Sequence, residues 1–280
     1  MPLPSSPPPP PPDPSKAGTD PVQTGPDLTP QPAAQGRKRY WLALLLWTAI
    51  ATAAYGLYSG HIVIPERFNP WAALDVAAPP NFLTGYKLSR VAHDPALCLS
   101  ALAQTGMQYD LLPDRVTGPD CGFRNAVRLR KAGVRFDAPL VLSCPMAVSF
   151  HMWERHALQP AAQQHFGQRV AAVEHLGSYA CRNINTGEGS KTTRRASRSR
   201  HATADALDIA GLTLANGKRI SVLRDWHRSD DATPVSPEAL LLADAHQGAC
   251  RFFRGTLGPE YNAVHRDHFH LETGGYPMCR

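Results

Sequence analysis

Residues 199–208 read Ser-Arg-His-Ala-Thr-Ala-Asp-Ala-Leu-Asp, and residues 265–270 read His-Arg-Asp-His-Phe-His. These two short segments hold four histidines and three aspartates. Neutral imidazole and carboxylate are the ligand types of a catalytic zinc ion that keeps one coordination position open for water. The two segments together indicate a metal-dependent hydrolase, whereas either segment alone is weak evidence.

The spacing within the two segments predicts how they converge. Residues 206–209 are typical of a strand, so His201 precedes this strand on a loop and Asp208 lies within it. Residues 269–272 predict a final strand. His268 and His270 are two residues apart, so on a strand they share one face. A loop histidine, a strand aspartate and a strand histidine can therefore meet at one ion.

The C-terminal part of the chain mixes helical and strand patterns. Helices are predicted over residues 95–105, 147–166 and 237–254, with Pro160 dividing the second and Gly255 ending the third. Extended segments are predicted at residues 121–127, 134, 139–145, 170–181, 206–209, 219–223 and 269–272. Helices and antiparallel strands mixed in this way predict the α+β class, in one compact domain over residues 88–280.

The N-terminal part has a different composition. Residues 1–36 are rich in proline and cannot bury enough apolar surface to fold, which predicts a disordered tail. Residues 37–60 hold a basic triplet and then an uncharged apolar run of about the 20 residues that cross a bilayer as a helix. Residues 61–87 hold several prolines and predict a linker.

The basic triplet Arg37-Lys38-Arg39 sets the expected orientation. Basic residues favour the cytoplasmic side of a membrane, so the tail is expected in the cytoplasm and the domain in the periplasm, with the bacterial inner membrane as the partner of the apolar run. A cleaved signal peptide ending near Ala51-Thr52-Ala53 is the alternative. Either arrangement exports the remainder of the chain.

The cysteines agree with export. All six follow the apolar run, and they form no Cys-x-x-Cys pair that would indicate a sulfur-bound zinc ion. An even number in an exported domain predicts three disulfides, for which 15 pairings are possible. Proximity along the chain favours the pairs Cys98–Cys121, Cys144–Cys181 and Cys250–Cys279.

The formal net charge is +6, and the isoelectric point is near 9.1. A basic balance suits nucleic acid, a membrane surface or another anionic polymer. Nucleic acid is a poor partner for an exported domain, so a metal-dependent nuclease is disfavoured. A cell-wall polymer with free carboxylates fits better.

The flanking residues of the histidine segments resemble a known superfamily. The pattern Ser199-x-His201-x-x-Ala204-x-Ala206-x-Asp208 is similar to the Ser-x-His-x-x-Gly-x-Ala-x-Asp signature of the LAS zinc peptidases. These include D-Ala-D-Ala carboxypeptidases, the penicillin-insensitive murein endopeptidase and the hedgehog signalling domain. Tyr179-Ala-Cys-Arg-Asn183 and residues 262–270 also resemble the bacterial extensin-like C-terminal family, over residues 81–280. The resemblance implies a hedgehog-like domain with a central antiparallel sheet.

The resemblance also implies roles for particular residues. His201, Asp208 and His270 correspond to the ligands of Zn²⁺, which lowers the pKa of a bound water to about 7. Asp267 corresponds to the catalytic carboxylate, although His265 is an almost equal candidate for the main proton carrier. His265 and His268 match histidines that would polarise the scissile carbonyl or stabilise the oxyanion.

The basic run before His201 has two interpretations. It is a solvated loop, or one of its arginines binds a substrate carboxylate through the planar guanidinium. The resemblance places that arginine shortly before Ser199, which makes Arg194, Arg195 and Arg198 the candidates. Ser199 itself either hydrogen-bonds around the metal loop or is a turn residue.

One position departs from the signature. Ala204 stands where the superfamily has glycine, so the loop is strained if this residue needs a positive φ.

These expectations combine into one functional hypothesis. The domain is expected to be a zinc peptidase acting on peptidoglycan peptides in the periplasm. The alternative is a catalytically inactive, zinc-containing module that binds the cell wall. The bond that is cut stays open among D-Ala-D-Ala, D-Ala-diaminopimelate and L-Ala-D-Glu.

Overall fold

A computed structural model of the chain describes residues 35–184, 197–228 and 234–280. The tail predicted to be disordered lies almost entirely outside these residues. The chain divides into two compact units, residues 1–63 and 64–280, and each is described by itself.

The first unit contains the helix α1 (Gln35–Tyr58). Its stretch Lys38–Tyr58 is long and apolar enough to cross a membrane, a test that a signal sequence also passes. Large apolar side chains such as Trp41, Leu45 and Trp47 are exposed along it. The position and composition of the predicted apolar helix are therefore confirmed.

Helical elements precede and interrupt the strands of the second unit. They are the 3-10 helix η1 (Glu66–Phe68), α2 (Thr84–His93), α3 (Pro95–Ala103), α4 (Cys144–Trp153), the π-helical turn η2 (Glu154–Leu158), α5 (Gln159–Phe166), the 3-10 helix η3 (Arg200–Thr203), α6 (Val222–Asp225), α7 (Pro237–Ala249) and the 3-10 helix η4 (Ala263–His265).

The strands of this unit form three sheets. They are β1 (Gln108–Leu112), β2 (Arg115–Gly118), β3 (Cys121–Phe123), β4 (Ala126–Lys131), β5 (Arg135–Phe136), β6 (Leu140–Ser143), β7 (Val170–Gly177), β8 (Ala206–Leu214), β9 (Arg219–Ser221), β10 (Gly255–Leu257), β11 (Phe269–Glu272) and β12 (Met278–Cys279).

The largest sheet has the strand order β12-β10-β11-β8-β7-β5, and β9 also pairs with β8. Its pairs are antiparallel except β10 with β12 and β5 with β7. A smaller sheet has the order β1-β4-β6, and β2 pairs with β3. Helices and several sheets in one unit confirm the predicted α+β class.

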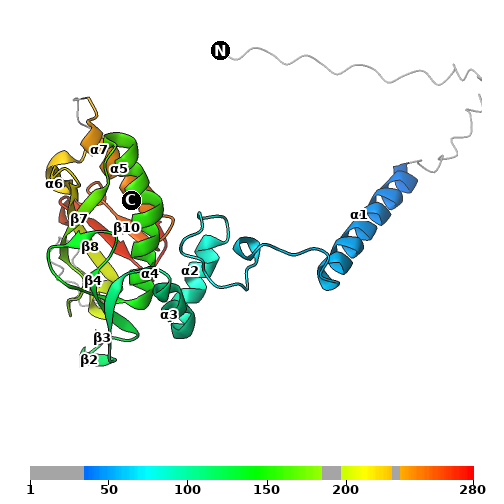
Figure 1. The fold of residues 1–280 in the computed structure, drawn as a ribbon, viewed down its shortest axis with the longest axis horizontal. Helices are drawn as coiled ribbons and strands as arrows, with labels where there is room; N and C mark the ends of the chain where they lie inside the picture. The colour runs from blue at the N-terminus through cyan, green and yellow to red at the C-terminus, as the bar shows by residue number, and fades with distance from the viewer. Residues whose placement is uncertain (1–34, 185–196, 229–233) are drawn as a thin grey trace, which may run out of the picture. The chain divides into compact units, whose positions relative to one another are not determined.

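The hydrophobic core lies between the large sheet and the helices that pack on it (Figure 1). Leu207 and Ile209 of β8 and Phe269 and Leu271 of β11 belong to this core. On the helical side, the indole Nε1 of Trp153 donates to a backbone carbonyl of α7 at 2.8 Å. Because side chains alternate along a strand, the residues between these core positions lie on the opposite face of the sheet.

The long middle helix differs from its prediction. It begins at Cys144, three residues before the predicted start, and passes from α4 through the π-helical turn η2 into α5. The predicted division of the helix is present as this π-helical turn directly before Pro160, because a proline inside a continuous helix removes one hydrogen bond and its ring crowds the carbonyl of the preceding turn.

The end of the last long helix was also predicted wrongly. The helix α7 ends at Ala249, and Gly255 begins strand β10 instead of terminating the helix. Gly255 is needed for close packing, because an added Cβ would lie 2.6 Å from the side chain of Glu272. The glycine that looked like a helix terminator thus makes room for the neighbouring strand.

Two of the three disulfide pairs predicted from the sequence are wrong. The structure joins Cys98 to Cys144, Cys121 to Cys181 and Cys250 to Cys279. Only the third pair was predicted. The first bond links α3 to the start of α4 and the second links β3 to the segment after β7, so tertiary packing and not proximity along the chain decides both.

The second unit begins before Leu88, the start predicted from the sequence. Its first segment is fixed to α2 by cationic side chains. Lys87 Nζ donates to the carbonyl of Glu66 at 2.9 Å, and Arg90 donates to the carbonyls of Pro70 and Trp71, both at 2.9 Å. Most of the region predicted as a linker is therefore part of the folded unit.

The buried His151 predicts a loss of stability in acid. Burial, with a contribution from the charge of Arg155, lowers the pKa of His151 from 6.5 to about 4. The unfolded chain then binds the extra proton first, so the stability present above pH 6.5 falls as the pH drops toward 4. Protonation of His151 in the unfolded chain should by itself lower the free energy of unfolding by about 3 kcal/mol below pH 4.

Chemical denaturation at several pH values checks this expectation. His151→Asn should flatten the decline between pH 6.5 and 4. The matched control is His93→Asn, which changes an exposed histidine and should leave the decline in place. An unchanged pH profile in the His151 variant would show that another group causes the decline.

Candidate metal centre

Strand register places two of the candidate ligands side by side. In the antiparallel pair β8–β11, Asp208 lies directly opposite His270. Both side chains are on the face away from the core, and each is only 8% exposed. Leu207 and Phe269, their chain neighbours, are buried in the core. The register of the two strands and the alternation of side chains along each of them thus place a carboxylate and an imidazole side by side.

The short helix η3 supplies the third side chain. Ser199 precedes it, and its Oγ accepts the backbone N–H of His201 at 3.3 Å. Ala204 ends it with φ of 59°, in the left-handed region. The strain foreseen at this position is therefore present, at a cost of about 1–2 kcal/mol for a residue with a Cβ. Ser199 thus caps the loop that carries His201, and no contact of its side chain with the side chains of His201, Asp208 or His270 is described.

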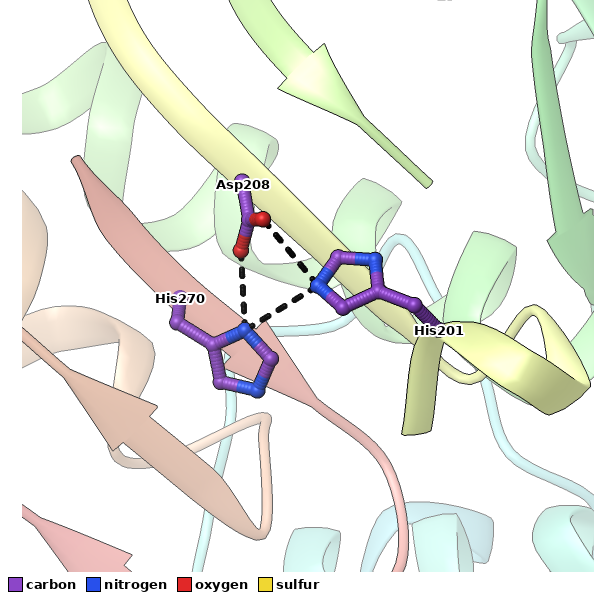
Figure 2. A group of neighbouring side chains, drawn as sticks. All are labelled: His201, Asp208 and His270. Carbon is purple, nitrogen blue, oxygen red and sulfur yellow. Dashed lines mark hydrogen bonds and ion pairs between the residues drawn. The ribbon is translucent and has the colours of Figure 1, made fainter. Parts of the chain in front are cut away.

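The three side chains meet at a buried point (Figure 2). His201 Nε2 lies 3.1 Å from Asp208 Oδ2, and His270 Nδ1 lies 2.8 Å from Asp208 Oδ1. The two imidazole nitrogens are 3.3 Å apart. One donor atom from each of the three residues lies within 4.8 Å of the others, as a metal centre requires.

The outer nitrogens of both imidazoles have acceptors. His201 Nδ1 lies 3.1 Å from the backbone oxygen of Ser178, and His270 Nε2 lies 3.1 Å from Glu272 Oε2. A carbonyl and a carboxylate only accept hydrogen bonds, so these two nitrogens are the donors. When both imidazoles are neutral, the lone pairs of His201 Nε2 and His270 Nδ1 point toward Asp208, an arrangement that a cation satisfies; without a cation, a proton on His270 Nδ1 takes that place.

The electrostatics of the centre favour an ionised carboxylate. Burial opposes ionisation of Asp208, but hydrogen bonds from His201 and His270 outweigh it and hold the pKa well below its usual range. Burial also opposes a charge on His270, but Asp208 and Glu272 outweigh it and raise the pKa to about 9. Burial, with the nearby charges of His268 and His270, lowers the pKa of His265 to about 4.

The other candidate catalytic residues surround this centre. His268 Nε2 lies 3.7 Å from Asp208 Oδ1, and its Nδ1 is 2.8 Å from Asp267 Oδ1. Asp267 has a half-exposed side chain. The ring of His265 lies 5.2 Å from that of His268 and 5.7 Å from that of His270. The structure thus brings the whole C-terminal cluster to one place.

A comparison with protein-family models places this arrangement in a family. Residues 96–280 match the family described as extensin-like protein C-terminus. The chain belongs to this family. No curated protein and no solved structure matches the chain. The histidine and aspartate cluster therefore lies entirely within the extensin-like domain.

The structure places only one of the three candidate arginines of the extensin-like domain. Arg198 donates to Asn183 Oδ1 and to the carbonyl of Pro119, both at 2.8 Å. Arg194 and Arg195 lie outside the described residues. Arg198 therefore fixes the loop ahead of His201 and has no described contact with the histidine cluster.

A different arginine of the domain lies at the centre. The guanidinium of Arg182 is 3.9 Å from Asp208 Oδ2, and 43% of its side chain is exposed. The Cys121–Cys181 disulfide fixes the preceding residue. Sequence reasoning quoted Arg182 within the Tyr-Ala-Cys-Arg-Asn motif but gave it no role. Its position next to a disulfide cysteine in that motif was the available signal.

Proposed function

We propose that this extensin-like domain is a zinc-dependent peptidase that cuts peptide stems or crosslinks of peptidoglycan in the periplasm. The observation that carries this proposal is the convergence of His201 Nε2, His270 Nδ1 and the Asp208 carboxylate at one buried point. The resemblance of the surrounding motifs to the LAS zinc peptidases supports the same reaction.

The donor set fits Zn²⁺ by its chemistry. Three protein ligands of the imidazole and carboxylate type are the usual set of a catalytic zinc centre with one open position. When bound, Zn²⁺ supplies Lewis acidity, which makes a water molecule nucleophilic near neutral pH and polarises a carbonyl group. His201, Asp208 and His270 would hold the ion, while Ser178 and Glu272 orient the two imidazoles.

The neighbouring residues supply the proton transfers. Hydrolysis of a peptide bond needs a base that takes a proton from the attacking water and returns one to the leaving amine. Asp267 and His265 are the two candidates for this role in the proposed mechanism. His268, held by Asp267 at 2.8 Å, is positioned to donate to the carbonyl oxygen as negative charge develops there.

We assign substrate-carboxylate binding to Arg182 instead of to the basic run before Ser199. Arg182 is partly exposed, lies beside Asp208 and carries a guanidinium that can bind a carboxylate through two parallel hydrogen bonds. Peptidoglycan stems carry free carboxylates of this kind. The same chemistry agrees with the net charge of +6.

Arg182→Ala is expected to raise KM about 10- to 100-fold, because one charge-assisted interaction contributes about 1.5–3 kcal/mol. Arg219→Ala is the matched control, since that guanidinium is largely exposed on β9 and pairs with Glu174. Steady-state kinetics on a purified stem peptide gives the result. Equal KM values in the two variants would contradict the assignment of Arg182.

Glu272→Gln is expected to weaken zinc binding about 10- to 100-fold, the usual effect of losing an outer partner of a ligand histidine. The amide still fills the space but no longer offers a charged acceptor to His270 Nε2. Competition with a chromogenic chelator measures the affinity. The control is Glu174→Gln, which changes an exposed carboxylate of β7 that pairs with Arg219, and it should keep the wild-type affinity.

The compartment in this proposal follows from α1 and the disulfides. The helix α1 serves as a single-pass anchor in the inner membrane, with Lys38 and Arg39 on the cytoplasmic side. Three disulfides and no free cysteine among the described residues suit an oxidising compartment such as the periplasm. A cleaved signal sequence would leave the domain in the same compartment.

Digestion of purified peptidoglycan tests the function. Zinc-loaded wild-type protein should release or shorten stem peptides, as seen by mass spectrometry of muropeptides, and His201→Ala should not. The identity of the new ends names the bond that is cut. Wild-type protein that binds sacculi but releases nothing would instead identify a zinc-containing cell-wall-binding module.

A further inference from the structure

An exposed aromatic surface lies at the start of the second unit. Trp71 and Phe82 are 76% and 81% exposed, and Phe68 and Tyr86 are also exposed. We refer to these four residues as the aromatic surface. Two of them, Phe68 and Phe82, are in contact, and several large aromatic side chains exposed within residues 68–86 mark an interaction site more often than scattered single residues do.

The backbone that carries the aromatic surface is held in place. Lys87 and Arg90 of α2 donate to carbonyls of Glu66, Pro70 and Trp71. The rings of Phe68 and Phe82 stack with centroids 6.1 Å apart. These contacts fix the segment against α2 while Trp71 and Phe82 stay exposed to solvent.

The length of the preceding chain indicates what covers this surface. The helix α1 ends at Tyr58, and the second unit begins at Ile64. Six residues of fully extended chain span at most about 22 Å. If α1 crosses a membrane, this length keeps the start of the second unit within about 22 Å of the end of the helix. Tryptophan and tyrosine are enriched at the bilayer surface because their rings are apolar and their N–H or O–H reaches water.

We propose that the aromatic surface inserts into the interfacial layer of the membrane that α1 crosses, with Trp71 and Phe82 as its deepest side chains. This inference rests on the proposed role of α1 as an anchor. It extends that role, since the domain is then held against the bilayer by its own surface as well as by the tether. The guanidinium of Arg67, which lies 4.6 Å over the ring of Phe68, suits the phosphate region beside it.

Tryptophan quenching by lipid tests the proposal on the full chain. The protein is reconstituted into phosphatidylcholine nanodiscs, with or without lipids brominated near the headgroup end of the acyl chain. In Trp41→Phe/Trp47→Phe protein, Trp71 is the reporter that is strongly exposed, since Trp153 is fully buried and Trp226 packs on His246 and Phe269. Brominated lipid should reduce the emission of this variant, and adding Trp71→Phe should abolish that loss.

A second tryptophan position gives a matched control. Leu223 is 54% exposed and belongs to α6, an element that lies at the opposite side of the unit from α2 (Figure 1). Adding Leu223→Trp to the triple phenylalanine variant should not restore quenching. If it does restore quenching, lipid contact is not confined to the aromatic surface, and the proposal is overturned.

The same experiment separates the anchor from the surface. Comparison of wild type with Trp41→Phe/Trp47→Phe reports lipid contact of α1. Quenching at Trp41 and Trp47 without quenching at Trp71 would overturn the aromatic surface as a membrane site and leave the anchor standing. Absence of quenching at all three positions would overturn both.

Discussion

Alanine at His201, Asp208 or His270 is expected to remove zinc from the purified protein and to abolish peptidase activity. Each residue supplies one of the three converging donor atoms. Two remaining protein ligands cannot retain an ion that water and buffer compete for. The loss of affinity should exceed the roughly 10- to 100-fold effect of an outer partner such as Glu272.

Metal analysis by mass spectrometry, with one zinc ion per wild-type chain, measures this effect. His175→Ala is a suitable control, because His175 lies on β7 and its Nε2 is 3.1 Å from Asp137 Oδ1, away from the three ligands. Circular dichroism of all variants separates metal loss from unfolding. Stoichiometric zinc that persists in all three ligand variants would contradict the assignment.

Removal of the Cys98–Cys144 disulfide is expected to lower the free energy of unfolding by about 4 kcal/mol. The bond closes a long loop, and without it the unfolded chain gains conformational entropy. The two cysteines are 46 residues apart and both are fully buried, so serine at these positions would also leave hydroxyls in the core. For a unit of this size, the melting temperature should fall by about 10 °C.

Thermal unfolding of Cys98→Ser/Cys144→Ser measures that loss, and non-reducing peptide mapping establishes the pairing. The Cys250–Cys279 pair closes a shorter loop, with a separation of 29 residues, and should contribute somewhat less. Peptides that join Cys98 to Cys121 would instead support the pairing expected from proximity. A serine variant with unchanged stability would show that the bond contributes nothing to the folded state.

Local sequence pattern was sufficient to predict the elements that carry the centre. Residues 206–209 and 269–272 have strand composition, and His268 and His270 have the period of a strand. The structure confirms both strands. The convergence of His201, Asp208 and His270 was implied by a motif resemblance, and it depends on a pairing register that spacing alone does not supply.

The parts that sequence reasoning missed depend on long-range packing. Glu272 reaches His270 because both point to the same face of β11, and Arg182 reaches Asp208 because a disulfide fixes Cys181. The partner of His201 Nδ1 is the backbone carbonyl of Ser178, and a backbone carbonyl leaves no pattern in the sequence that could predict this contact. Both disulfide predictions were wrong for the same reason: the folded chain brings together cysteines that are far apart along the sequence.

The N-terminal boundary shows a different difficulty. Prolines between residues 61 and 80 indicated a linker, but the carbonyls of this segment accept hydrogen bonds from Lys87 and Arg90 of α2. Proline disfavours the interior of helices and central strands, but it does not exclude a fixed irregular segment. Leu74 and Val76, which are buried, attach this segment to the core.

The most direct test is anomalous diffraction at the zinc absorption edge from crystals of the zinc-loaded protein. One peak is expected within about 2.0–2.2 Å of His201 Nε2, His270 Nδ1 and an Asp208 carboxylate oxygen. Such a peak would place the ion among the three side chains that β8, β11 and η3 bring together. A fully loaded crystal with its zinc peak elsewhere, or with no contact to these three residues, would contradict the proposed centre.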